Sequence, residues 1–447
     1  MLDPLEAVSP IDGRYRKKTE ELAPYFSEKG LIKYRILVEL KYLLFLKKSG
    51  IPQLASMPIA PIEKMIEQTL ELSTSEAQKI KDIEATTNHD VKAVEYYIKD
   101  KMREVGLSEF LEFVHFGLTS QDINNTAVPL SLKEAMAEVV YPKMLDVISD
   151  INDLVKISSD IPMLARTHGQ PASPTLLAKE LRVFQVRLND QLPFIYSIPF
   201  RAKFGGATGN FNAHVLAYPE FNWHDLGKSF VEEDLGLSRS YPTTQIEHYD
   251  MLAAHCHGIM RFNTILLDMC RDIWTYISMD YFSQKVIKNE VGSSAMPHKV
   301  NPIDFENAEG NIGIANALLG HLANKLPVSR LQRDLTDSTV LRNLGVPLGH
   351  TLIALKSIKK GLSKLIVNKS RISSDLDEHW AVLSEAIQTV LRREGFERPY
   401  ELLKDLSRGN EKIDQTTIRR FIDTLEVSDA VKAELTQLTP ATYVGKA

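Results

Sequence analysis

Hydrophobic residues recur at helical spacing along much of the chain. The segment from Ile259 to Val291 contains no glycine or proline, and its apolar residues follow one another every three or four positions. This spacing places them on one face of an α-helix. The apolar stripe comprises Ile259, Phe262, Leu266, Met269, Ile273 and Tyr276. An unbroken helix over 259–291 would be about 50 Å long.

Three other segments have the same periodicity. Their apolar positions are Met144, Ile148, Ile151 and Val155; Leu177, Leu181, Phe184 and Leu188; and Leu355, Ile358, Leu362 and Leu365. Helices with such stripes pack nearly parallel to one another in bundles. Ser173-Pro174 has the composition of a helix N-cap followed by the first helical residue. Because alternating strand patterns are scarce and no βαβ unit can be traced, we predict an all-α fold.

The flanking regions have shorter apolar segments that are separated by proline and glycine. A chain of 447 residues also exceeds the size at which one hydrophobic core keeps growing. We therefore predict three helical domains: an N-terminal domain over 1–108, a central bundle of long helices over 109–366 that forms the oligomer core, and a C-terminal domain over 367–447.

The composition excludes several functional classes. The chain is 44% hydrophobic and 25% charged, as is typical of globular proteins, and its net charge of -5 disfavours a general nucleic-acid-binding protein. The N-terminus lacks the features of a signal peptide, and no apolar run approaches the roughly 18 residues of a membrane span. Only two cysteines are present, which suits a reducing compartment. We expect a cytoplasmic protein without nucleic-acid or membrane partners.

The segment 292–302, GSSAMPHKVNP, has the composition of a reactive loop. Ser293 lies beside a glycine, prolines 297 and 302 disfavour a helix, and Lys299 adds a fixed cation. A hydroxyl base, free backbone N–H groups and a cation are what is needed to remove a weakly acidic proton and to stabilise the carbanion. A polar surface turn is the alternative interpretation.

Four further clusters hold candidate functional residues. A histidine in a turn, His168 in 166–172, can act as an acid or base near neutral pH, or can simply hydrogen-bond in its turn. Segments 86–95 and 115–122 have cap-type residues at expected helix starts, where an anion or only a cap could bind. In 330–342, Arg333, Ser338 and Arg342 could converge on one anion, or the arginines could pair with Asp334 and Asp337.

Other motifs lack the spacing of a cofactor site. His255, Cys256 and His257 are consecutive on an expected helix, so their side chains diverge and cannot share a metal ion. The glycine-rich segment 205–209 matches neither a dinucleotide-binding nor a P-loop pattern. We expect neither a metal nor a cofactor.

Taken as a string, 292–302 resembles the GSSxMPxKxNP signature of the fumarase/aspartase superfamily. Together with SPIDGRY at 9–15, TTNHDVKAVEYY at 86–97 and the cluster at 330–343, the chain resembles, nearly end to end, the adenylosuccinate lyase family of C–N lyases. That resemblance implies a homotetramer with active sites shared between subunits. It also implies a cofactor-independent elimination that releases fumarate from adenylosuccinate, giving AMP, and from SAICAR, giving AICAR.

The resemblance also implies residue roles. Ser293 would be the general base and His168 the general acid, while Lys299 and Asn301 would hold the carboxylate next to the developing carbanion. The remaining residues would bind or position the substrate: Arg14, Tyr15, Asn88, His89, Asp90, His115, Thr119, Ser120, Gln245, Glu306, Arg333, Ser338 and Arg342. Of these, His89 and Glu306 would also belong to the catalytic group. Some relatives have arginine where this chain has Asn307, so contacts at that position cannot be transferred.

Two alternative functions remain. Another fumarate-releasing lyase of the superfamily, acting on argininosuccinate, fumarate or aspartate, has a substrate without a phosphate monoester. Two groups of residues would then lack a purpose: Arg14 with Tyr15, and Arg333 with Ser338 and Arg342. A non-catalytic structural protein on the same fold would have no need to keep Ser293, His168 and Lys299.

Overall fold

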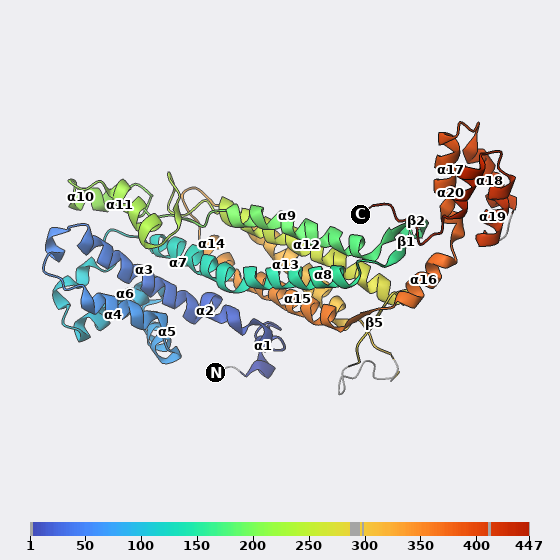
Figure 1. Ribbon diagram of the computed structural model, residues 1–447. Helices are drawn as coiled ribbons and strands as arrows, with labels where there is room; N and C mark the ends of the chain where they lie inside the picture. Colours follow the sequence, from blue (N-terminus) through green and yellow to red (C-terminus); the bar gives the residue numbers. More distant parts are fainter. Residues whose placement is uncertain (1–2, 287–295, 297–298, 410–412, 447) are drawn as a thin grey trace. The chain divides into compact units, whose positions relative to one another are not determined.

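The computed structural model describes residues 3–286, 296, 299–409 and 413–446 (Figure 1). Most of these residues are helical, and the few strands form three separate two-stranded sheets in the described part of the chain. The all-α prediction is therefore confirmed. The chain forms two compact units: unit 1 comprises Met1–Leu145, Gln191–Thr264 and Gly310–Lys356, and unit 2 comprises Asp146–Asp190, Ile265–Glu309 and Ser357–Ala447. The domain boundaries at 108/109 and 366/367 stay a prediction.

Unit 1 contains the N-terminal helices. Its helices are α1 (Arg16–Thr19), α2 (Ala23–Phe26), α3 (Glu28–Lys48), α4 (Ala60–Leu70), α5 (Thr74–Thr87), α6 (Asp90–Glu104), α7 (Ser120–Ala135), α10 (Asn212–Ala217), α11 (Trp223–Ser229) and α14 (Thr336–Leu341). Strands β3 (Arg201–Ala202) and β4 (Ser238–Arg239) pair in parallel. Helix α3 packs against α7, α4 and α6 and is buried on almost all sides. It is the central element of this unit.

Five long helices have residues in both units: α8 (Tyr141–Ile157), α9 (Leu177–Ser197), α12 (Asp250–Ser278), α13 (Ile303–Lys325) and α15 (Gly345–Lys364). Their predicted apolar stripes are buried almost throughout; only Val155 and Tyr276 are half-buried. The predicted helix over 259–291 is wrong in its length, because α12 ends at Ser278 and strand β5 (Phe282–Gln284) follows. A run without glycine or proline permits a helix but does not stop one from ending where the chain pairs elsewhere, here with β6 (Leu365–Val367).

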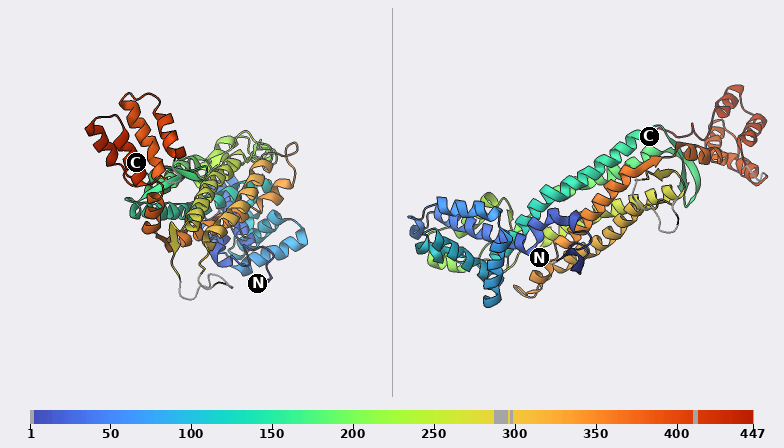
Figure 2. Two further views of the ribbon diagram at one scale, coloured as in Figure 1. Left: turned by 90° about the vertical axis from the view of Figure 1, so that its right-hand side faces the viewer. Right: turned by 90° about the horizontal axis from the view of Figure 1, so that it is seen from below.

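Within unit 2, polar side chains connect the five long helices in a closed order. Gln185 of α9 donates to Asn152 of α8 at 3.1 Å, and Arg187 of α9 contacts Asp268 of α12 at 2.6 Å. The remaining contacts are Arg271–Glu309 at 2.8 Å, Ser357–Asn307 at 2.9 Å and Lys359–Asp146 at 3.2 Å. The helices thus lie side by side in this unit, as Figures 1 and 2 also show. The predicted bundle of long helices is confirmed.

The rest of unit 2 includes a hairpin and five short α-helices in the described part of the chain. Strands β1 (Pro162–Thr167) and β2 (Gln170–Leu176) pair antiparallel. The helices are α16 (Lys369–Asp377), α17 (Ser384–Arg393), α18 (Pro399–Gly409), α19 (Gln415–Thr424) and α20 (Asp429–Thr436). A separate apolar core, with Leu383, Ile387 and Leu391 fully buried, holds the C-terminal helices together.

The predicted helix cap at Ser173-Pro174 is wrong. Both residues belong to β2, and helix α9 begins at Leu177. The proline pairs with Leu164 next to an irregularity in the register, a position where a strand tolerates a missing N–H group. In the part of the chain that the structure describes, no helix combines the length and the apolarity needed to cross a bilayer.

Candidate functional site

The starts of α6 and α7 lie close together in unit 1. Asn88 ends α5 in the left-handed conformation, with φ of 51°, which asparagine tolerates better than most residues. The chain therefore turns at once into α6, and His89 is the N-cap, because its Nδ1 accepts a hydrogen bond from the Lys92 N–H at 3.0 Å. The prediction that Thr86 to Asn88 cap α6 is wrong, since the two threonines complete α5.

His89 faces the start of α7. Since its Nδ1 accepts a hydrogen bond, the proton of the neutral ring is on Nε2, which lies 3.5 Å from the Ser120 Oγ. Thr119 is the N-cap of α7, and Ser120 is its first residue, as predicted for this segment. The first turn of a helix has N–H groups that its own carbonyls cannot satisfy, and its dipole favours an anion. The starts of α6 and α7 together therefore offer hydroxyl, imidazole and backbone donors.

A buried carboxylate, that of Asp122, holds the start of α7 in place. Asp122 is fully buried and accepts a hydrogen bond from the Thr119 N–H at 2.8 Å, and its other oxygen contacts the Lys203 Nζ at 2.7 Å. The N–H groups of Gly205 and Gly206 also donate to it, at 2.8 Å and 3.1 Å. The glycine-rich segment thus wraps around the carboxylate. Burial lowers the pKa of Lys203, and the Asp122 charge opposes that shift.

His115 is paired with buried glutamates. Its Nδ1 lies 2.6 Å from Glu39 Oε1 and its Nε2 lies 3.8 Å from Glu95 Oε1. Burial alone would lower the pKa of His115, but the carboxylates, Glu39 foremost, outweigh burial and raise it. The ring is therefore held in a setting that favours its cationic form.

Asp90 joins two arginines. Its Oδ2 accepts from the Arg35 Nη2 at 2.6 Å and from the Arg342 Nη2 at 2.8 Å. Burial would raise the pKa of Asp90, but the Arg35 and Arg342 guanidinium groups lower it. Arg342 also contacts Glu28 at 2.8 Å, so it does not pair with Asp334 or Asp337 as the alternative interpretation had it. It is Arg330 that lies 3.1 Å from Asp334, and Arg333 that lies 3.8 Å from Asp337.

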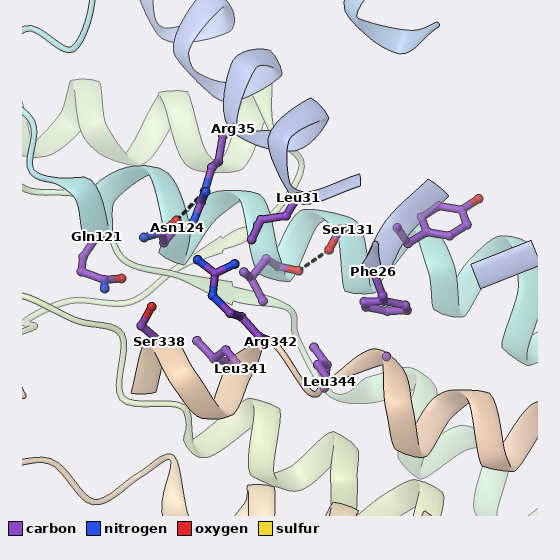
Figure 3. Close-up of a pocket in the computed structure, with 13 residues that line it drawn as sticks. Phe26, Leu31, Arg35, Gln121, Asn124, Ser131, Ser338, Leu341, Arg342 and Leu344 are labelled. Atoms are coloured by element: carbon purple, nitrogen blue, oxygen red, sulfur yellow. Dashed lines mark hydrogen bonds between the residues drawn. The ribbon is translucent and has the colours of Figure 1, made fainter. Parts of the chain in front are cut away.

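A pocket with a cavity volume of about 50 Å³, partly open to solvent, brings several of these residues together (Figure 3). Ser338 and Arg342 line it beside Arg35, Gln121 and Asn124. Phe26, Leu31, Leu341 and Leu344 form its apolar side.

Arg333 lies in a second, more open pocket. Gln245 and Thr208 line that pocket with it, and the Arg333 Nη1 donates to the Gln245 Oε1 at 3.3 Å. Of the three residues predicted to converge, the structure brings Ser338 and Arg342 into one pocket and places Arg333 in another. Arg14 is exposed, with its guanidinium 5.9 Å from the Tyr15 ring centroid, and neither residue lines these two pockets in the described structure.

In unit 2, His168 lies at the tip of the β1–β2 hairpin. Thr167 pairs with Gln170, so His168 and Gly169 form a two-residue turn, with φ of 53° and 75°. Such tight turns require positive φ at both central positions. His168 is exposed at this tip. The prediction that it is a turn histidine is confirmed, although the turn belongs to a hairpin.

The base of the hairpin is anchored to α16. The Arg166 Nη2 donates to both oxygens of Asp375, at 3.1 Å and 2.8 Å, and the Tyr281 hydroxyl donates to the same carboxylate. Burial would raise the pKa of Asp375, but these two donors lower it. The arrangement fixes the strand immediately before His168.

The described candidates of unit 2 other than His168 lie just before α13 or in its first turn. Ser293 lies outside the described residues. Lys299 is exposed and Asn301 half-buried in the segment before the helix. Glu306, in the first turn of α13, accepts a hydrogen bond from the Trp274 Nε1 at 3.1 Å. Asn307 accepts one from Ser357.

The histidine–cysteine run offers no metal site. No group of three or more His, Cys, Asp or Glu side chains in the described part of the chain could hold a metal ion. The His255 ring stacks on Phe200, and burial lowers its pKa to about 4. Cys256 and Cys270 are both free and buried.

Several residues of the unit 1 site were not predicted. Arg35, Glu39, Gln121, Asp122 and Lys203 complete the arrangement described above. Arg35 and Glu39 stand four positions apart in segment 31–46, which is largely apolar but also contains Lys33 and Lys41. Charged residues are rarely fully buried unless they are paired, so charged residues of both signs within a largely apolar helix were a usable signal. Lys203 had no such signal, because its partner is 81 positions away.

Comparisons with known proteins cover almost the whole chain. The family model described as "Lyase" matches residues 13–316, and the model described as "Adenylosuccinate lyase C-terminal" matches residues 329–444. The chain is 54% identical to an adenylosuccinate lyase of Dictyostelium discoideum, over 99% of this chain and 97% of the relative. It is 51% identical to that of Legionella pneumophila (strain Corby) and 49% identical to that of Escherichia coli (strain K12), each over 100% of this chain and 98% of the relative.

A solved structure supports the fold. The crystal structure of 3-carboxy-cis,cis-muconate lactonizing enzyme from Pseudomonas putida matches with a TM-score of 0.72 over 95% of this chain and 93% of that chain. The two sequences are 20% identical, so this likeness concerns the fold alone.

Proposed function

Because the chain belongs to the adenylosuccinate lyase family and is a C–N lyase, we propose that it splits adenylosuccinate into AMP and fumarate. We also propose that it converts SAICAR into AICAR and fumarate by the same elimination, without a cofactor. One observation in unit 1 supports a nucleotide substrate. Ser338 and Arg342 share a pocket with Gln121, the residue that follows Ser120 at the start of α7. These three side chains can together recognise a ligand that carries a phosphate and a hydroxyl.

The proposed elimination needs one base and one acid. The Ser293 oxygen takes the Cβ proton of the succinyl group, and the electron pair left on that carbon forms the C=C bond of fumarate as the C–N bond breaks. His168 gives a proton to the departing nitrogen. The exposed position of His168 at a hairpin tip supports this role, because a proton donor must be able to reach its substrate. Lys299 and Asn301 hold the carboxylate whose charge grows as the proton leaves.

The unit 1 residues bind the substrate in this proposal. Ser338 and Arg342 contact the nucleotide phosphate, and Thr119, Ser120 and Gln245 contact the succinyl end. His89, Asp90 and His115 position these groups through the contacts described above. Roles for Arg14, Tyr15, Asn88, Arg333 and Glu306 in substrate binding or positioning complete the proposal.

An ultraviolet assay tests the function. We expect the purified protein to change the absorbance of adenylosuccinate as fumarate is released, and Ser293→Ala to abolish turnover while leaving substrate binding largely intact. Loss of a group that acts only in proton removal falls on kcat. Near-normal kcat in Ser293→Ala would remove Ser293 from the role of base, and no turnover by the wild-type protein would overturn the proposed reaction.

We further propose a cytoplasmic homotetramer with active sites shared between subunits. Exposed apolar side chains on α9, namely Val183, Val186, Phe194 and Tyr196, support an association of helices between copies of the chain. The two buried, free cysteines are compatible with a reducing compartment.

Mixing inactive variants tests shared sites. Hybrids of His168→Ala and Ser293→Ala should regain part of the activity, because some sites then receive both wild-type residues from different chains. Verified hybrids that stay inactive would mean that both residues come from one chain.

A further inference from the structure

Gln121 has a buried acceptor without a donor. It is the second residue of α7, directly after Ser120, and its side chain is 1% exposed. Its Oε1 has no hydrogen-bond partner among the described residues. A buried polar atom left unpaired destabilises the structure, because it has lost its hydrogen bonds to water without gaining another. Such an atom in a pocket indicates that a ligand supplies the missing donor.

The pocket around Gln121 is divided into a polar and an apolar side. Figure 3 shows the Gln121 amide and the Ser338 hydroxyl facing the same space, with the guanidinium groups of Arg342 and Arg35 next to it. The apolar side is formed mainly by Phe26 and leucines. The ligand part that enters the polar side is therefore small and strongly polar.

The hydrogen-bonding capacity of the polar side restricts the ligand further. Arginine side chains only donate, and a serine hydroxyl can donate to an anion. Arg35 already donates to Asn124 at 2.9 Å and to Asp90, so its orientation is fixed. Gln121 Oε1 is the acceptor that needs a donor. A ligand that satisfies the whole group carries an anion for the donors and a hydroxyl for Gln121 within a few bonds, as a sugar phosphate does.

We propose that Gln121 determines specificity for the sugar: its Oε1 accepts a hydrogen bond from a ribose hydroxyl while Ser338 and Arg342 hold the phosphate. This inference rests on the proposed function, since it takes the ligand to be a ribotide. It predicts that the enzyme discriminates against a nucleotide lacking that hydroxyl. The discrimination arises because the deoxy substrate leaves the buried carbonyl unpaired.

The test compares three substrates: adenylosuccinate and its 2′-deoxy and 3′-deoxy analogues. For the wild-type protein we expect kcat/KM to fall about 10- to 100-fold on one of the two analogues. Gln121→Met keeps the volume but removes the acceptor. The variant should lower kcat/KM on adenylosuccinate by a similar factor. On the deoxy analogue that the wild-type protein disfavours, kcat/KM of the variant should be nearly the same as that of the wild-type protein. Gln185→Met, a half-buried glutamine of α9 outside the site, should behave as wild type on all three.

Three results would overturn the proposal. The first is equal kcat/KM of the wild-type protein on all three substrates. This measurement needs no variant, so it tests the proposal even if Gln121→Met fails to fold. The second is an equal loss on all three substrates in Gln121→Met, which would assign Gln121 a structural role. The third is an unchanged kcat/KM for adenylosuccinate in that variant. The absence of any turnover of adenylosuccinate by the wild-type protein would instead contradict the proposed function, and so the two failures are distinguishable.

Discussion

The candidate residues of unit 1 and unit 2 are held in different ways. In unit 1, Asp90, His115 and Asp122 are surrounded by charged or backbone partners, and the carboxylate of Asp122 alone receives donors from Thr119 and from the segment 203–206. In unit 2, His168 and Lys299 are exposed, on a hairpin tip and on the segment before α13. The first arrangement fixes groups before a ligand arrives. The second leaves its groups accessible from solvent.

In the proposed mechanism, this difference corresponds to a division between substrate binding and proton transfer. Preorganised donors and acceptors suit contacts that exist throughout the reaction, whereas an acid acts at one step. We therefore expect changes in unit 1 to alter stability, substrate affinity and specificity, and changes at the unit 2 candidates to alter kcat. The following predictions test this division, from the largest expected effect to the smallest.

His168→Ala should lower kcat about 10²- to 10⁴-fold, the usual contribution of a positioned acid, with little change in KM. Steady-state measurement of fumarate release gives both constants. His257→Ala is the matched control, because His257 is exposed on α12 and lies outside the proposed site. A raised KM with an unchanged kcat would place His168 among the binding residues and contradict the division of roles between the two units.

Asp122→Asn should destabilise unit 1 by about 3–5 kcal/mol, because it leaves Lys203 as a buried cation without a counter-ion. The double variant Asp122→Asn/Lys203→Met should recover part of the loss, since it removes the charge as well. Urea titration followed by circular dichroism gives the apparent free energy of unfolding. Equal stability of the single and double variants would show that the ion pair is not what the fold requires.

Glu39→Gln should change stability in a pH-dependent way. Since the pKa of His115 is raised in the folded protein, the His115–Glu39 pair gives its full stabilisation below the pKa of an unfolded histidine, about 6.5, and loses it as the pH rises through the folded-state pKa. The wild-type protein should exceed Glu39→Gln in stability by about 1.5–3 kcal/mol at pH 5.5, with a smaller or absent advantage at pH 9. Thermal unfolding at the two pH values measures it. A constant difference would argue against ionisation of His115.

Ser27→Ala should cost about 1 kcal/mol, because Ser27 is the N-cap of α3 and accepts a hydrogen bond from the Gly30 N–H at 3.0 Å. Ser173→Ala in unit 2 should cost less, because Ser173 lies in β2, caps no helix and donates its hydrogen bond to the exposed Glu385 carboxylate. The two variants are compared by their urea midpoints at equal slope. A larger loss for Ser173→Ala would mean that the exposed Ser173–Glu385 hydrogen bond contributes more to stability than the cap of α3 does.

The long helices could be predicted well from the sequence, whereas the helix ends and the short strands could not. The apolar stripe of α9 at 177–188 was predicted correctly because its period depends on local side-chain pattern alone. The end of α12 at Ser278 and the strand at Ser173-Pro174 depend on pairing with β6 and β1, which are distant in sequence. Local patterns cannot reveal such pairings.

The candidate site shows the same limit. Residue types and motifs identified Ser338 and Arg342, but not that Arg342 would share Asp90 with Arg35. The placement of Arg333 in a separate pocket also depends on how segment 330–342 folds. Arg342 follows Ser338 by four positions and Arg333 by nine, and outside a regular helix such spacings do not determine where a side chain points.

AMP binding tests the division between the units most directly. We expect isothermal titration to give a dissociation constant for AMP in His168→Ala within about threefold of the wild-type value, because the acid contributes to the transition state rather than to product binding. Arg342→Met should weaken AMP binding by about tenfold or more, since it removes a charge-assisted contact to the phosphate. If His168→Ala weakened AMP binding as much as Arg342→Met does, or if Arg342→Met bound AMP as tightly as the wild-type protein, the assignment of binding to unit 1 and proton transfer to unit 2 would be wrong.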